Sequence, residues 1–158
     1  MYRYSAIISD GTFPCSTAVI QGDLHTCFAK ASAFGFDCVQ LTVRSPSDYP
    51  ADLLNSLCEE FGLSVSAMAT GRMYSVDKLC MGNSDEINRR KCLNRLCSFA
   101  DYSTLIGHPA IVIGAIRGYF SDAVSEESYC KQFDKSIREL SEYCKTICAC
   151  YSGGNRPL

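Results

Sequence analysis

The sequence lacks the long hydrophobic segments that membrane insertion requires. No apolar run approaches the roughly 18 residues of a membrane span, and the N-terminus carries no apolar segment of the secretory type. A basic face is missing as well, because the 15 Lys and Arg residues are scattered and the net charge is −2. We therefore expect neither a membrane nor a nucleic acid as a partner, and we expect a cytoplasmic location.

Several motifs that carry chemistry in α/β proteins are also missing. No G-x-G-x-x-G follows the first predicted strand, and no phosphate-binding loop of the P-loop type occurs. The usual nucleotide sites of open α/β sheets are thereby excluded. The sequence has only two histidines, and its serines, cysteines and histidines form no nucleophile pattern readable from their spacing, so the catalytic residues stay unassigned.

Cysteine, in contrast, is plentiful, with 11 residues. The one cluster of interest, Cys144-x-x-x-Cys148-x-Cys150, has no C-x-x-C pair of the zinc type and no nearby histidine. Most other cysteines fall in stretches with helical periodicity, on or beside the apolar stripe, where they act as small hydrophobic side chains. We expect reduced, mostly buried thiols rather than a metal site or disulfides.

The feature that is present is a strand–helix pattern that repeats four times. Short strands are predicted over residues 4–9, 38–43, 63–69 and 110–113. The last of them, A-I-V-I between Pro109 and Gly114, has the composition of a strand buried on both faces. Helices with apolar residues at helical spacing are predicted after each strand, over residues 24–34, 51–61, 85–106 and 126–149.

Four consecutive strand–helix units specify a parallel sheet with right-handed crossovers. Two α/β architectures contain such units: an open doubly wound sheet, and the eight-unit TIM barrel, which needs about 250 residues. The 158 residues of this chain suffice for half a barrel, and the missing nucleotide motifs favour the barrel. We therefore predict a (βα)4 half TIM barrel with outer helices over residues 1–149, followed by an irregular tail over residues 150–158.

Three stretches add a family resemblance to this pattern. They are G-F-D-C-V-Q-L at residues 35–41, G-L-S-V-S-A-M-A-T-G-R at 62–72 and I-V-I-G-A-I-R-G at 111–118. In register with the four units, they resemble the N-terminal half of the sugar and sugar-phosphate isomerases and epimerases that have a xylose-isomerase-like TIM barrel. The resemblance implies ketose–aldose isomerisation or C3 epimerisation of a small sugar or sugar phosphate.

The resemblance also implies a divalent metal (Mn, Mg or Co) in full-length members. There, two Glu, one Asp and one His from later strands hold the metal, which polarises the sugar oxygens while carboxylates move a proton between adjacent carbons. In this sequence Gln40 stands where the family usually has Glu, and residues 150–158, at the place of the fifth strand, contain no Glu. We therefore expect no metal site and no isomerase activity in the isolated chain.

The candidate ligand-binding residues follow the predicted strands, because ligands of parallel α/β folds bind at the carboxyl ends of the strands. Arg72 and Arg117 carry guanidinium groups that fork onto phosphate or hydroxyl oxygens. Thr70 and Tyr74 flank Arg72 in the sequence. Each residue also has a structural interpretation: the arginines pair with nearby acids, and Tyr74 packs as a lid aromatic. Asp10, after the first strand, either joins the site or begins a turn.

Two functions of different class remain open. In the first, the chain is a truncated or partial metal-dependent isomerase or epimerase whose catalytic half is lost or supplied by another chain. In the second, it is a non-catalytic half-barrel that binds a ligand or another copy of itself. Half a barrel leaves its first and last strands and its inner face uncovered, which favours self-association. The aliphatic side chains expected to face solvent or a partner are those of Ile7, Leu41, Val65, Met68 and Val112.

Overall fold

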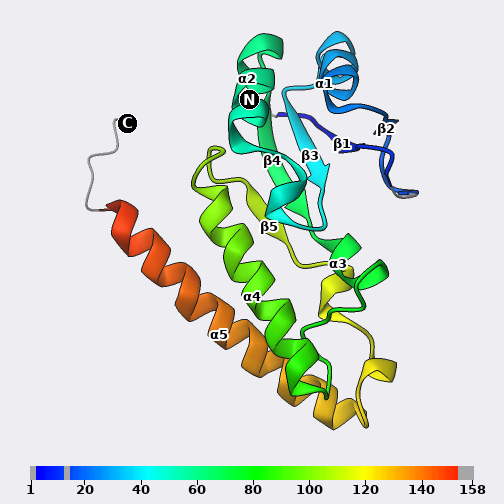
Figure 1. The fold of residues 1–158 in the computed structure, drawn as a ribbon, viewed down its shortest axis with the longest axis vertical. Helices are drawn as coiled ribbons and strands as arrows, with labels where there is room; N and C mark the ends of the chain where they lie inside the picture. The colour runs from blue at the N-terminus through cyan, green and yellow to red at the C-terminus, as the bar shows by residue number, and fades with distance from the viewer. Residues whose placement is uncertain (1–2, 13–14, 153–158) are drawn as a thin grey trace.

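A computed structural model describes residues 3–12 and 15–152, and Figure 1 shows the fold. The strands of the described residues form one parallel sheet with the order β2-β1-β3-β4-β5. The four predicted strands are confirmed as parallel neighbours in sequence order, as a half TIM barrel requires. The strands are β1 (Ser5–Ser9), β2 (Ile20–Gln21), β3 (Cys38–Thr42), β4 (Ser64–Ala69) and β5 (Ala110–Val112).

The four predicted helices alternate with these strands. Asp23 caps the first by accepting a hydrogen bond from the Thr26 N–H, and Gly62 ends the second in the left-handed conformation, with φ of 65°. No helix among the described residues is long and apolar enough to cross a membrane. The helices are α1 (Leu24–Ala33), α2 (Ala51–Phe61), the short α3 (Gly71–Ser75), α4 (Glu86–Ser103) and α5 (Glu126–Ser152).

The last helix differs from the others in its packing. Figure 1 shows α5 running beside α4 and leading away from the sheet. It extends through Ser152, beyond the predicted helix end at residue 149. The rest of the tail predicted over residues 150–158 lies outside the described residues.

Two short elements, β2 and α3, were not predicted. The loop after β1 returns to pair with it, because the Val19 N–H donates to the Ile7 carbonyl at 2.9 Å and the Gly22 N–H donates to the Ser9 carbonyl at 3.1 Å. The first predicted strand is therefore not an open edge, and that expectation is wrong. A two-residue strand and a five-residue helix are too short to show a period in the sequence.

The face of the sheet that meets the helices carries the hydrophobic core. A bulge in the ladder between β3 and β4 adds Ser66 on β4, so residues three apart on that strand face the same way. The expectation that Leu41, Val65 and Met68 face solvent or a partner is wrong, because all three side chains are buried. The bulge places Val65 and Met68 on one face, and Leu41 lies on the same face because it is in register with Ile8 and Met68. The neighbours in register on this buried face are Ala6 and Ile8 of β1, Val39 and Leu41 of β3, and Val65 and Met68 of β4.

The opposite, inner face of the sheet carries small and polar side chains. The hydroxyls of Ser5 and Ser66 lie 2.7 Å apart on it, and Gln40 occupies its centre. Val112 is 37% exposed, so the expectation of exposure is confirmed for it, whereas Ile7 is only half-buried. The prediction that the last strand is buried on both faces is wrong, because Ala110 and Val112 of β5 are exposed and Ile111 is half-buried.

A charged residue occupies the junction between α4 and α5. Arg89 of α4 is the largest fully buried side chain among the described residues. It donates two hydrogen bonds to Glu86, at 2.6 and 2.7 Å, and one to Glu139 of α5 at 3.2 Å. A fourth goes to Ser136 of α5 at 3.1 Å. The buried cation is thus neutralised and fixes α5 on α4.

We expect Arg89→Ala to lower the free energy of unfolding by about 3 kcal/mol, because it removes one partner of a buried ionic network. Arg90→Ala is the matched control, because Arg90 contacts the same Glu86 and Glu139 carboxylates but is 55% exposed. Its expected cost is below about 1 kcal/mol. Urea unfolding measures both changes, and equal losses in the two variants would contradict this account of the junction.

Candidate functional site

The predicted site residues lie at the carboxyl edge of the sheet but do not form one cluster. Thr70 directly follows β4, Arg72 and Tyr74 lie on α3, and Arg117 lies in the short helical turn η2 (Ala115–Arg117) after β5. The segments α3 and η2 are in contact, and a Cβ atom added at Gly71 would lie 3.9 Å from Ala115 Cβ. The structure therefore brings the two loops together, but the four predicted side chains have different partners and do not point to one site.

Arg72 turns back over the inner face of the sheet. Its side chain is 7% exposed, and Nη2 donates to the Ser9 hydroxyl at 2.7 Å. Nη1 donates to the Asp10 carboxylate at 3.0 Å, and the Thr42 carbonyl lies 3.5 Å away. One guanidinium that follows β4 thus binds the ends of β1 and β3.

Asp10 fills both of the roles considered for it. It begins a turn, since its Oδ1 accepts hydrogen bonds from the Thr12 N–H at 3.1 Å and the Thr12 hydroxyl at 2.8 Å. It also pairs with Arg72. Burial raises the pKa of the Asp10 carboxyl, but the hydrogen bonds from Thr12 and Arg72 outweigh burial, so the pKa lies below its ordinary value. Burial and the nearby Asp10 charge raise the pKa of the Tyr49 phenol.

Thr70 and Tyr74 hold the loops in place. The fully buried Thr70 donates from Oγ1 to the Val112 carbonyl at 2.9 Å, which ties the end of β4 to the end of β5. The Tyr74 hydroxyl donates to the Asp122 carboxylate at 3.0 and 3.2 Å, and its ring meets Tyr119 edge-to-face at 5.4 Å. Burial and the Asp122 carboxylate raise the pKa of Tyr74 to about 12.

Arg117 is exposed and lines a groove between the loop after β5 and α5. The groove has a volume of about 460 Å³. The Tyr129 hydroxyl donates to the Arg117 carbonyl at 3.2 Å, which fixes the backbone of the loop on α5. Four aromatic rings line the groove with the guanidinium, those of Tyr119, Phe120, Tyr129 and Phe133.

A further ionic cluster at this edge was not predicted. Arg44, two residues after the end of β3, donates from Nε to both carboxylate oxygens of Asp77 at 3.0 Å, and Arg95 of α4 donates to the same carboxylate. Asp77 lies in the loop after α3, where the sequence shows no periodicity, and Arg95 is one of several charges on a helix. The position of Arg44 after a predicted strand is the one feature of this cluster that the sequence could indicate.

The described residues do not fit a metal of the kind that the family resemblance implies. They contain no group of three or more His, Cys, Asp or Glu side chains that could hold a metal ion. His25 instead lies 3.1 Å from Glu60, on the outer helices α1 and α2. Apart from Cys144, the cysteines whose side chains the structure describes are free thiols, and the side chains of Cys148 and Cys150 in the predicted cluster lie outside the described residues. No reaction step through a metal follows from this chain's described residues.

Solved structures with the same arrangement include sugar epimerases. D-psicose 3-epimerase from Clostridium cellulolyticum H10 matches with a TM-score of 0.66 and 11% identity, over 92% of this chain and 49% of that one. For D-allulose 3-epimerase from Methylomonas sp. the TM-score is 0.62 and the identity 13%, over 90% and 47%. A xylose isomerase domain protein from Planctomyces limnophilus gives 0.60 and 14%, over 92% and 51%. The chain spans about half the length of these proteins.

The structural likeness, at these low identities, shows a shared fold. No curated protein matches the chain. Residues 28–147, well over half of the chain, match the model of a family described as xylose isomerase-like TIM barrel. The chain therefore belongs to the xylose isomerase-like TIM barrel family.

Proposed function

We propose that the chain is the ligand-binding half of a sugar-converting barrel and that a small sugar or sugar phosphate binds beside Arg117. Its family and the epimerases of similar fold support this class of ligand. The proposed reaction of the whole barrel is metal-dependent ketose–aldose isomerisation or C3 epimerisation. In both reactions a proton moves between adjacent carbons of the sugar.

The aromatic groove at Arg117 carries this proposal. Small-molecule sites are concave, mostly apolar and fitted with a few polar groups, and the groove combines these features. Tyr119 and Phe120 are 57% and 53% exposed, so their rings are available to pack against the C–H faces of a sugar. The exposed Arg117 guanidinium is placed to donate hydrogen bonds to hydroxyl or phosphate oxygens.

The other three predicted residues act on the ligand through their neighbours in this proposal. Tyr74 positions Tyr119 in the groove wall, and Thr70 holds β4 to β5 beneath the loops. Arg72 is bound to Ser9 and Asp10, so we assign it a positioning role at the inner rim. No residue is assigned to proton transfer, and the metal chemistry of the family requires residues beyond those described here. We therefore expect the isolated chain to bind ligand without converting it.

Titration with D-allulose and with a hexose 6-phosphate tests the groove. At about 0.3 kcal/mol per non-hydrogen atom, a monosaccharide is expected to bind with millimolar affinity. Arg117→Gln is expected to weaken binding of the phosphate ester about tenfold, because a charge-assisted hydrogen bond contributes roughly 1.5–3 kcal/mol. Calorimetry measures the affinities. The melting temperature is expected to stay unchanged because Arg117 is exposed.

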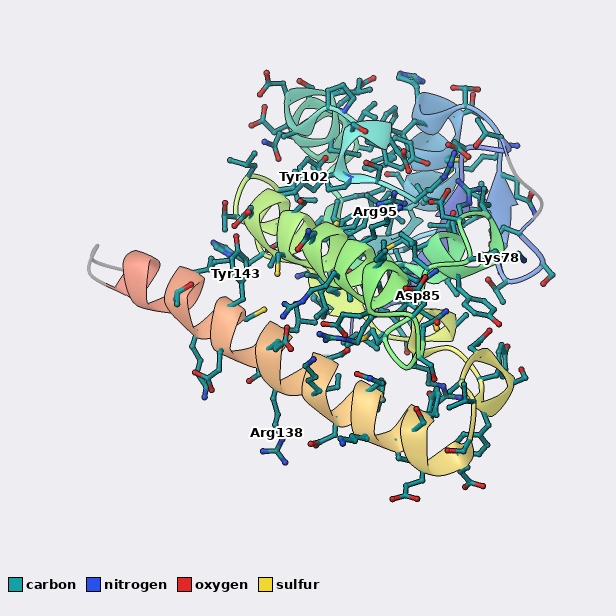
Figure 2. All side chains as sticks on the ribbon, turned by 60° about the horizontal axis from the view of Figure 1, so that its bottom comes forward. Lys78, Asp85, Arg95, Tyr102, Arg138 and Tyr143 are labelled. Atoms are coloured by element: carbon teal, nitrogen blue, oxygen red, sulfur yellow. The ribbon has the colours of Figure 1, made fainter. Side chains whose placement is uncertain are left out.

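Arg138→Gln on α5 is the control for the loss of one positive charge. Figure 2 shows Arg138 pointing away from the body of the molecule, and its side chain is 76% exposed. This variant is expected to bind both ligands as the unmodified chain does. The proposal fails if neither ligand gives a saturable signal, or if the two arginine variants weaken binding equally.

We also propose, as the second candidate function, that the chain associates with another copy of itself. The specific observation is the edge of β5, the outermost strand of the described sheet, where Val112 is 37% exposed. An unpaired strand edge presents a row of N–H and C=O groups that can pair with another strand. Such pairing does not require the exposed aliphatic face first expected, because Leu41, Val65 and Met68 are already buried within the chain.

Sedimentation velocity at micromolar concentration is expected to show a dimer. Val112→Lys is expected to shift the chain to a monomer, because a charge on an edge strand opposes pairing. Val124→Lys is the matched control, since Val124 lies before α5 and is 86% exposed. A monomer at every concentration, or an equal effect of the two lysine variants, would rule out association through β5.

A further inference from the structure

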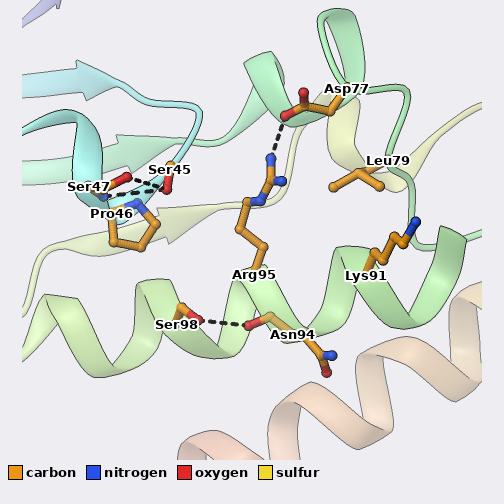
Figure 3. Close-up of a pocket in the computed structure, with 9 residues that line it drawn as sticks. All are labelled: Ser45, Pro46, Ser47, Asp77, Leu79, Lys91, Asn94, Arg95 and Ser98. Atoms are coloured by element: carbon orange, nitrogen blue, oxygen red, sulfur yellow. Dashed lines mark hydrogen bonds and ion pairs between the residues drawn. The ribbon is translucent and has the colours of Figure 1, made fainter. Parts of the chain in front are cut away.

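A second groove, of about 660 Å³, opens beside the carboxyl end of β3. Figure 3 shows its walls: the loop of residues 45–47 on one side, α4 on the other, and Asp77 and Leu79 above α4. The residues that line it are different from those at the Arg117 groove and from those bound by Arg72. This groove is therefore separate from the proposed sugar site.

The ionic contacts of this groove leave it cationic. Asp77 is the one carboxylate among its lining residues, and Arg44 binds that carboxylate from outside the lining. Hydrogen bonds from Arg44, partly offset by burial, and from Arg95 lower the pKa of Asp77, so its charge persists. Three cations, Arg44, Arg95 and Lys91, thus lie at or beside the groove with the single Asp77 carboxylate. Arg44 is sufficient to balance Asp77, so the groove keeps a net positive charge from Arg95 and Lys91.

The carboxylate of Asp48, directly after the loop of residues 45–47, does not cancel the positive charge of Arg95 and Lys91 in the groove. Asp48 accepts hydrogen bonds from the backbone N–H groups of Arg44, at 2.7 Å, and Ser45, at 3.0 Å. It is thus held at the start of the loop and is not among the lining residues. Arg95 uses Nη1 for Asp77, its one acceptor among the described residues, and Lys91 is exposed. Both cations retain donors for a further acceptor.

We propose that this groove binds a phosphorylated small molecule, with the phosphate between Arg95 and Lys91. A phosphate monoester carries close to two negative charges at neutral pH, which matches two cations better than a neutral sugar does. The hydroxyls of Ser47 and Ser98 and the exposed amide of Asn94 supply further polar contacts around it. The half-buried Pro46 offers apolar surface for the rest of the ligand, above the buried Leu79.

The test is a titration of the full chain with inorganic phosphate and with inorganic pyrophosphate at constant ionic strength, followed by amide NMR. We expect saturable shifts confined to the groove, at residues 45–47, 77–79 and 91–98. Lys91→Gln is expected to weaken binding of pyrophosphate about tenfold, the loss of one charge-assisted hydrogen bond. Its melting temperature is expected to stay unchanged, because Lys91 is exposed.

Lys131→Gln on α5 is the matched control, since Lys131 is exposed and lies outside the groove. It is expected to bind pyrophosphate like the unmodified chain. Three results would overturn the proposal: shifts that rise linearly without saturation, saturable shifts at Arg117 in place of the groove, or equal weakening in the two lysine variants. The last would show general charge attraction in place of a site.

Discussion

The carboxyl edge of the sheet depends on the ion pair between Arg72 and Asp10. The Arg72 side chain is 7% exposed and that of Asp10 is 19% exposed, so each charge requires the other as a partner. Because Arg72 follows β4 and Asp10 follows β1, the pair fixes the distance across β3 and holds α3 back against the sheet. With α3 in that position, the Tyr74 ring packs on the Tyr119 ring, and Tyr119 and Arg117 both line the groove described above.

The two faces of the sheet explain how half a barrel holds together. The helix-facing side supplies a continuous apolar core, whereas the inner side carries residues such as Ser5, Gln40 and Ser66, which tolerate water. An open inner face of this kind costs far less than a row of wet aliphatic side chains, each of which forgoes roughly 1.5–3 kcal/mol. Arg89 is a second buried cation that joins two elements through carboxylates: it ties α5 to α4, as Arg72 ties the end of β1 to α3.

The sequence predicts the fold better than it predicts the site. Strand and helix periodicity locate four parallel units because each unit is long enough to repeat its pattern several times. The inner face was predicted wrongly because alternation along a strand shows which residues share a face but not which face meets the helices. On β4 the bulge at Ser66 also interrupts the alternation, and a bulge leaves no mark on composition. Arg72 and Arg117 were found from their positions after strands. Their partners Asp10 and Tyr129, and the Asp77–Arg95 contact, depend on long-range packing that no local pattern encodes.

A double-mutant cycle on the rim pair tests this account most directly, with Asp10→Asn, Arg72→Met and the combined variant compared by urea unfolding. At pH 7 we expect a coupling free energy of about 2 kcal/mol between the two positions. Because the pKa of Asp10 in the folded chain lies below its ordinary value of 3.8, the coupling should persist down to about pH 4. It should vanish as the pH falls through that lowered pKa. Additive effects at pH 7, or a coupling that survives protonation of Asp10, would contradict the claim that this pair sets the rim.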